Sequence, residues 1–239
     1  RDTVMTCGVH TSGRLDPDTI ADALDRMQSS DLPPREQMVF IDSGEARTPR
    51  AVVAWADPVP LLTEACALFE HFGLQVADQH PVTAPGHPLT VSVFDFATPH
   101  DWRADSESKL ADAFAARRAH SFLIDDYARL VISAGITWRE VILVRSVSRF
   151  VRQAGLAMSD SYVLGTLTGQ AEFVATLVEL FAARFDPQLC DRESPVADLQ
   201  SRLAGLIEAT TSVDEDRILR AFASFVSATL RTNWFQRDP

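Results

Sequence analysis

Lysine is almost absent from this 239-residue chain: Lys109 is the only one, and arginine supplies the rest of the positive charge. Any mechanism that needs a lysine amine must therefore use Lys109. That residue follows the polar stretch Ser106-Glu107-Ser108, which predicts an exposed helix start. We therefore assign it no catalytic role.

Glycine is also scarce, with 10 in the chain, and none falls in the GxGxxG or GxxxxGK(S/T) spacing. Loops that cradle phosphates need such glycines because the backbone must approach the phosphates closely. The GxSxG turn of many serine hydrolases is missing as well. We therefore expect no nucleotide cofactor and no catalytic residue in this chain.

The three cysteines, Cys7, Cys66 and Cys190, show no CxxC spacing. They predict reduced thiols in a cytoplasmic protein, not a disulfide framework or a zinc site. No stretch reaches the roughly 18 unbroken apolar residues that a membrane span requires. The chain has no signal peptide and does not begin with methionine, so we expect a cytoplasmic piece excised from something longer.

The formal net charge of -11 argues against nucleic-acid binding, because neutralising phosphates needs a basic face. The acidic groups at 125–126 and 214–216 do not converge on one substrate atom, since adjacent helical residues point about 100° apart. We expect the first pair in mid-helix, bound to Arg129 or Arg118. The second group suits a helix start, where the helix dipole favours acids.

The six histidines lie in different expected elements, without the i, i+4 spacing that places two imidazoles on one helical face. His80-Pro81 and His87-Pro88 flank a turn, so these two histidines could meet in space. We favour exposed loop histidines and predict no metal site.

The first half of the chain, to about Trp102, mixes proline-rich turns with short apolar runs, which is typical of strands and short helices. Asp16-Pro17 starts a helix that extends to about Ser29. Strands are expected at 38–41, 50–55, 74–77 and 89–96, and a helix runs from Pro58 or Pro60 to Gly73. This order predicts a small β-α-β-β sheet covered by helices.

The second half, from about residue 104, shows sustained helical periodicity with capping residues. One helix is expected from Ser106 to Ala134, and Thr137 with Glu140 forms a capping box for the next. That next helix carries Val141, Val144, Val147, Phe150 and Val151 on one side. Ser212 and Glu215 form a second capping box, which starts a last helix that contains Ile218, Leu219, Phe222, Val226 and Leu230. Repeated antiparallel helices predict a bundle, so the fold class is α+β.

Arginine and aromatic residues gather near the C-terminus. The main members are Arg217, Arg220, Arg231, Trp234 and Phe235. Because the whole chain is acidic, we favour core packing of the two aromatic rings and an interface role for the arginines over an RNA-binding patch. These five residues are the possible interface.

Three groups of short stretches share a pattern with one protein family. They are 73–81 (GLQVADQHP) with 93–96 (VFDF); 129–141 with 152–155 and 178–187 (VELFAARFDP); and 214–220 with 229–236 (TLRTNWFQ). Together they resemble the large bacterial NAD-specific glutamate dehydrogenases. The first group is similar to the last ACT-like regulatory module of that family. The others are similar to the helical region ahead of its catalytic domain.

This resemblance implies a domain organisation. Residues 1–103 would form an ACT-like module with an N-terminal extension, and residues 104–239 a helical domain. The catalytic lysine and the nucleotide-binding fold would belong to a part that this chain lacks. NAD would be the cofactor of the parent enzyme, which converts L-glutamate to 2-oxoglutarate and ammonium. The partners of the chain would be its own catalytic domain and other subunits of a homo-oligomer.

The resemblance also suggests where an effector would bind. Effector-binding ACT domains have an Asp-x-Pro-Gly-Leu-like turn between first strand and helix, and here the turn reads Asp57-Pro58-Val59-Pro60-Leu61. Pro60 stands where a glycine would let an amino acid approach, and it has no N–H to donate. Asp57, Pro60 and Leu61 are therefore possible effector-binding residues, although we expect a structural or interface module.

The resulting hypothesis is a non-catalytic regulatory and scaffolding segment of a glutamate dehydrogenase, which serves subunit assembly and positions the catalytic domain. Two alternatives stay open. One is an amino-acid-sensing module that binds an effector near Asp57. The other is a stand-alone helical adaptor.

Overall fold

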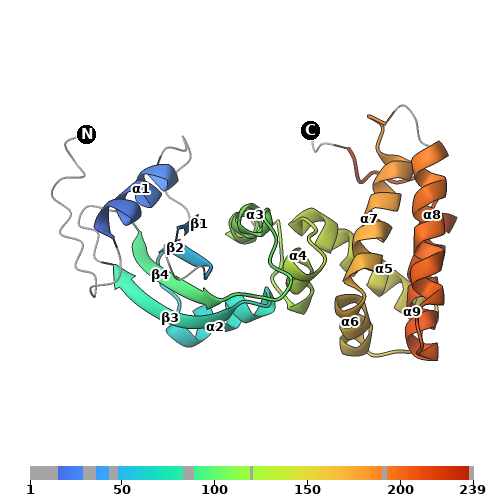
Figure 1. Cartoon of the computed structure of the whole chain (residues 1–239), viewed down its shortest axis with the longest axis horizontal. Helices are drawn as coiled ribbons and strands as arrows, with labels where there is room; N and C mark the ends of the chain where they lie inside the picture. The colour runs from blue at the N-terminus through green and yellow to red at the C-terminus, as the bar shows by residue number, and fades with distance from the viewer. Residues whose placement is uncertain are drawn as a thin grey trace. The chain divides into compact units, whose positions relative to one another are not determined.

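The computed structural model of the chain describes residues 16–28, 36–42, 48–82, 89–118, 121–189 and 193–236. The chain divides into two compact units, Arg1–Ile132 and Ser133–Pro239. The first contains a four-stranded antiparallel sheet with helices, and the described part of the second is built from helices (Figure 1). The expected α+β fold class is confirmed.

The first unit begins with a helix and a strand and continues through a β-α-β-β arrangement. Its elements are α1 (Pro17–Gln28), β1 (Gln37–Ile41), β2 (Arg50–Trp55), α2 (Leu62–His71), β3 (Gln75–Val82), β4 (Thr90–Ala97) and α3 (Ser106–Arg118). The strand order is β1-β2-β4-β3, and all neighbours are antiparallel. The connection from β2 through α2 to β3 therefore leaves one strand position between them, which β4 fills.

The end of α2 follows its sequence signal. Gly73 has φ +80°, the left-handed conformation that glycine adopts without strain. Its N–H donates to the carbonyl of Glu70 at 2.8 Å, and the N–H of Leu74 donates to the carbonyl of Phe69 at 3.0 Å. These two bonds satisfy the last carbonyls of the helix and turn the chain into β3.

The two faces of the sheet are covered differently. Helix α1 packs an apolar cluster against one face, and Figure 1 shows α1 and α2 on opposite sides of the sheet. The α2 side holds an aromatic layer made by Trp55, Phe69, Phe94, Phe96 and Phe114, with ring centroids 4.9–6.3 Å apart. Edge-to-face packing of this kind adds to the stability that burial supplies. Strand β4 buries residues on both faces.

The single helix expected from Ser106 to Ala134 is wrong. Helix α3 ends at Arg118, and after a break the chain forms the short 3-10 helix η3 (Asp126–Arg129) and α4 (Leu130–Ser133). The start of η3 has a local cause at Asp125, whose backbone is extended and whose carboxylate accepts the N–H of Tyr127 at 3.1 Å. Aspartate competes in this way with helical hydrogen bonding and starts a new turn. Helix α3 packs against β1. The domain boundary expected between residues 103 and 104 stays a prediction.

The second unit is a set of capped helices. They are α5 (Trp138–Gln153), α6 (Asp160–Gly169), α7 (Ala171–Phe185), α8 (Glu193–Glu208) and α9 (Val213–Ala228). At the start of α5 the carboxylate of Glu140 accepts the N–H of Thr137 at 2.7 Å, and the Thr137 hydroxyl accepts the N–H of Glu140 at 3.4 Å. At α6 and α9 the serine hydroxyl alone makes the cap: Ser159 accepts the N–H of Tyr162, and Ser212 accepts that of Glu215. The expected N-terminal caps are therefore confirmed.

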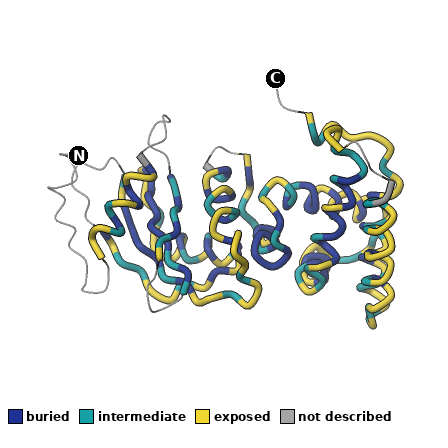
Figure 2. The backbone as a smooth tube through the Cα atoms, turned by 45° about the horizontal axis from the view of Figure 1, so that its top comes forward, coloured by how far each residue is buried: buried dark blue, intermediate teal, exposed yellow. Residues whose placement is uncertain are grey.

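Helix α7 lies at the centre of the unit's packing, since it contacts α5, α6, α8 and α9. Its buried residues include Phe173, Leu177, Leu180 and Phe181. Helix α8 turns most of its residues to solvent (Figure 2). Phe150, expected on the apolar side of α5, is 53% exposed. The expected extension of the last helix to Leu230 is wrong: α9 ends at Ala228, the backbone becomes extended at Thr229, and Leu230 is 89% exposed.

Candidate interface at the C-terminal end of the helical unit

The possible effector turn lies at the start of α2, on the surface of the first unit. Asp57 is exposed, Pro60 is half-buried and the side chain of Leu61 is 69% exposed. The N–H of Leu61 donates to the carboxylate of Glu64 at 2.8 Å. Because Pro60 has no N–H and Glu64 occupies the next donor, the turn offers little for an amino-acid carboxylate. Its role in effector binding stays a prediction.

The first acidic pair occupies a different setting from the one expected. Asp125 starts η3 and is not in mid-helix, for the reason given above. Asp126 lies 2.9 Å from Nδ1 of His71 in α2 and 3.9 Å from Arg129, so the expected contact with Arg129 is present. The contact between His71 and Asp126 joins α2 to η3.

His80 is not an exposed loop residue: it lies in β3, and its side chain is only 14% exposed. Its Nε2 is 3.4 Å from Asp78 and 3.6 Å from Asp95, and Asp95 also forms a two-point ion pair with Arg50 in β2. The pairing of β3 with β4 brings these groups together on one face of the sheet. Within the described ranges, no three His, Cys, Asp or Glu side chains are placed to hold a metal ion. His87 lies outside the described residues.

Two of the possible interface arginines bind acids of their own helix. Arg217 lies 4.0 Å from Asp214, and Arg220 lies 2.8 Å from Asp216. The hydrogen bond to Asp216 is the main cause that raises the pKa of Arg220 above its ordinary value. The acids at 214–216 are thus at a helix start, as expected. From Arg220 to the end of α9 is roughly 12 Å of helix, so these arginines are separated from the C-terminal residues.

The C-terminal residues form an extended segment after α9, which we call the C-terminal strap (residues 229–236). Trp234 meets Phe181 of α7 edge-on at 6.3 Å, and Phe235 stacks on the same ring at 6.2 Å. The guanidinium of Arg139, in the first turn of α5, lies 5.9 Å from the Trp234 ring. Both aromatic residues of the strap are half-buried. Their packing on the helical core is the role that the sequence suggested.

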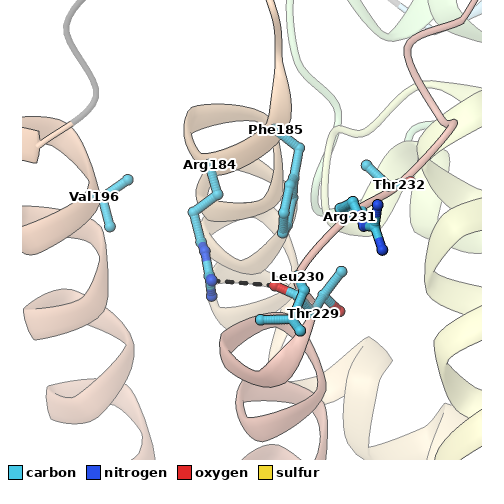
Figure 3. Close-up of a pocket in the computed structure, with 7 residues that line it drawn as sticks. All are labelled: Arg184, Phe185, Val196, Thr229, Leu230, Arg231 and Thr232. Carbon is cyan, nitrogen blue, oxygen red and sulfur yellow. Dashed lines mark hydrogen bonds between the residues drawn. The ribbon is translucent and has the colours of Figure 1, made fainter.

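Arg184, in the last turn of α7, was not singled out from the sequence. Its guanidinium donates to the carbonyl of Val226 at 2.6 Å. It also donates to the carbonyl of Thr229 at 3.3 Å (Figure 3). These carbonyls lie at the end of α9, where helical partners run out. Arg184 therefore attaches the end of α9 to α7. The only sequence signal was a cation in the last turn of a helix, which serves its own helix dipole equally well.

A surface pocket of about 610 Å³ lies where α7, α8 and the strap meet. The described residues that line it are Arg184, Phe185, Val196, Thr229, Leu230, Arg231 and Thr232 (Figure 3). They include no carboxylate, imidazole or thiol that could act as a nucleophile or general base. The Thr229 hydroxyl donates to the carbonyl of Phe225 at 2.7 Å, and the Thr232 hydroxyl accepts the N–H of Trp234 at 3.1 Å. This mixture of apolar, cationic and hydroxyl groups suits recognition of another surface.

The candidate interface residues thus lie in two places. The C-terminal strap carries Arg231, Trp234 and Phe235. Helix α9 carries Arg217 and Arg220. Leu230 joins the first set because it is almost fully exposed at the pocket. Across the described part of the chain, no helix has both the length and the apolar character needed to cross a bilayer.

Comparison with known proteins shows that this chain is similar to glutamate dehydrogenases. The family model described as glutamate dehydrogenase, helical motif 3, matches residues 123–187, from the loop before η3 to the end of α7. The protein called NAD-specific glutamate dehydrogenase in Mycobacterium tuberculosis is 36% identical over 190 residues, which are 73% of this chain and 12% of that protein. Its namesake in Halomonas elongata is 30% identical over 185 residues, 75% of this chain and 11% of that protein.

The protein of the same name in Pseudomonas aeruginosa is 28% identical over 193 residues, which are 77% of this chain and 12% of that protein. The chain therefore spans only about one eighth of the length of the relatives it matches. Over about three quarters of its own length, it is homologous to a segment of the NAD-specific glutamate dehydrogenases, which confirms the resemblance seen in the sequence.

Proposed function

We propose that this chain is a non-catalytic regulatory and scaffolding segment of a cytoplasmic, NAD-dependent glutamate dehydrogenase. The parent enzyme converts L-glutamate to 2-oxoglutarate and ammonium, and NAD binds to a part of it outside this chain. The segment serves assembly of the homo-oligomer and positions the catalytic domain. The names of the homologous proteins support the parent activity.

The observation that carries the scaffolding role is the attachment of the C-terminal strap. Arg184 binds the end of α9, and Trp234 and Phe235 pack on Phe181 of α7. The direction in which the chain leaves the bundle is therefore set by side-chain contacts and not by a free linker. A segment with a fixed exit direction is suited to placing a following domain.

The topology of the first unit supports an ACT-like module. In the β2-α2-β3-β4 portion, two parallel strands flank an antiparallel strand, and the crossover helix lies on one face of the sheet. Split β-α-β arrangements of this kind are typical of ferredoxin-like folds. The carboxylate of Glu64 accepts the N–H of Leu61 at the start of α2, so this donor is not free to bind an effector. This contact favours a structural module over an effector-binding one.

Substitution of the exposed pocket residues in the full-length enzyme tests the proposal. Leu230→Ala and Arg231→Ala alter side chains that face solvent, so the fold should be preserved. We expect weaker subunit assembly in sedimentation, or slower NAD-dependent glutamate turnover, at an unchanged melting temperature. The matched control is Arg202→Ala on α8, which breaks an exposed ion pair with Glu172 of α7. Wild-type assembly and turnover in both pocket variants would contradict the scaffolding role.

A second measurement tests the absence of catalysis. The purified 239-residue chain should neither turn over glutamate with NAD nor bind NAD in a calorimeter. Turnover by this chain alone would overturn the non-catalytic assignment.

A further inference from the structure

The C-terminal strap has contacts of its own that are distinct from those of the helices. It contains two local hydrogen bonds: the N–H of Trp234 donates to the Thr232 hydroxyl at 3.1 Å, and the N–H of Gln236 donates to the carbonyl of Asn233 at 2.9 Å. Beyond Thr229, the strap contacts the helices through aromatic packing on Phe181 and through Arg139. The strap thus has a turn of its own and a small set of attachments.

These attachments are weaker than those of the neighbouring helix. Leu230, Arg231, Thr232 and Asn233 are exposed, and Trp234 is only half-buried. In α9, by contrast, Ile218, Leu219 and Phe222 have no exposed surface. Segments with few buried apolar contacts open at a lower free energy than the cores they cover. The strap can therefore open while the helical unit stays folded.

Arg139 is in a special position for this opening. Its guanidinium lies 5.9 Å from the ring centroid of Trp138, its neighbour on α5, and also 5.9 Å from that of Trp234. The side chain is exposed, so it remains in the cation–π contact with Trp138 when the strap leaves. At an exposed site, one cation–π contact changes an opening equilibrium by roughly two- to five-fold.

We infer that the C-terminal strap is a latch, which opens and closes as a unit and which the contact between Arg139 and Trp234 holds closed. The closed strap covers Phe181, which is only 3% exposed, and opening uncovers this ring as an apolar surface on α7. Within the proposed function, the closed latch holds the catalytic domain in its productive placement. This regulatory consequence rests on the proposed function, whereas the latch itself does not.

Hydrogen exchange of the intact protein tests the latch. In Arg139→Ala, a peptide that spans residues 230–236 should exchange roughly two- to five-fold faster, while peptides from α9 keep their wild-type rates. Arg149→Ala is the matched control, because Arg149 is an exposed arginine on the same helix. Trp234→Ala should accelerate exchange in the same peptide, and Arg139→Ala should add nothing to it. Unchanged exchange in Arg139→Ala, or equal acceleration in Arg149→Ala, overturns the latch.

Turnover by the full-length enzyme tests the regulatory consequence separately. Arg139→Ala should slow NAD-dependent glutamate turnover, and Arg149→Ala should not. Faster exchange with wild-type turnover would overturn the regulatory consequence. A wild-type enzyme that shows no such turnover refutes the proposed function, and the exchange experiment still decides on the latch.

Discussion

Arg184 at the end of α7 donates a 2.6 Å hydrogen bond to the carbonyl oxygen of Val226 in α9. The two residues are 42 positions apart in the sequence, and the same guanidinium also reaches the carbonyl of Thr229. One side chain therefore replaces helical partners that the end of α9 lacks. The strap begins at this point.

Arg184→Ala should destabilise the helical unit by about 1–3 kcal/mol, because it leaves carbonyls at the end of α9 without a charged donor. Arg184→Lys should recover only part of this loss, since an ammonium cannot reproduce the two-point contact of a guanidinium. Urea unfolding measures both variants. Arg149→Ala is the control and should unfold at the wild-type midpoint. Equal stability of Arg184→Ala and wild type would refute the anchoring role of Arg184.

Thr137→Ala removes half of the capping box of α5 and should cost about 1 kcal/mol of unfolding free energy. Ser146 provides a control within the same helix: it is exposed, and its hydroxyl donates back to the carbonyl of Ile142 at 2.7 Å. Ser146→Ala should be neutral or slightly stabilising, because alanine is the better helix former. Thermal and urea unfolding would show the contrast. A larger loss in Ser146→Ala than in Thr137→Ala would contradict it.

Phe222→Ala should cost about 3–5 kcal/mol, because the ring is fully buried and its removal leaves a cavity. Phe225 lies one turn further along α9, is half-buried and meets the exposed Phe150 edge-on at 5.0 Å. Phe225→Ala should cost less than half as much as Phe222→Ala. Urea midpoints of the two variants test the depth of burial, and similar losses would mean that α9 is rotated from the orientation described.

Asp16 carries the pH dependence that we expect for α1. The Thr19 hydroxyl, 2.7 Å away, is the main cause that lowers the pKa of this carboxyl below its ordinary value near 3.8, and the N–H of Asp18 adds to it. Since the folded pKa is the lower one, the ionised cap stabilises α1 above the unfolded pKa. This contribution is lost as the pH falls below about 4 and through the folded pKa. A carboxyl NMR titration should show the pKa of Asp16 rising in Thr19→Ala.

Two outcomes would contradict this account of the cap. One is an unchanged pKa of Asp16 in Thr19→Ala. The other is the same acid-induced loss of α1 amide protection in Asp16→Asn, which has no carboxyl group to titrate.

Free amino acids should leave the melting temperature of the chain unchanged at millimolar concentrations. The reason is that Pro60 has no N–H and the carboxylate of Glu64 accepts that of Leu61. A ligand that binds only the folded state raises the melting temperature, so a thermal-shift screen is a direct test. A shift that disappears in Asp57→Ala would restore the effector-binding alternative.

Local chemistry allowed much of the fold to be predicted from the sequence. Thr137, Ser159 and Ser212 each accept the N–H of a residue three positions later, and Gly73 ends α2. These interactions involve neighbours in the chain, so the residue pattern is enough to locate them. The family resemblance also depends on local runs, which is why it was visible before the structure.

Long-range packing decided the features that the sequence did not. His80 is only 14% exposed because the pairing of β3 with β4 places it beside Asp95. The five candidate interface residues separated into two groups because α9 ends at Ala228. Such outcomes depend on which strands pair and where a helix stops.

The sequence by itself determined the fold class, the capped helices and the gathering of Arg231, Trp234 and Phe235 near the C-terminus. Packing of the helices brought Trp234 and Phe235 onto Phe181, Trp234 beside Arg139, and the start of the strap at Thr229 onto Arg184. The physical reason is that caps and periodicity act over three or four residues. The attachment of the strap requires groups that the chain brings together only after α5, α7 and α9 have packed.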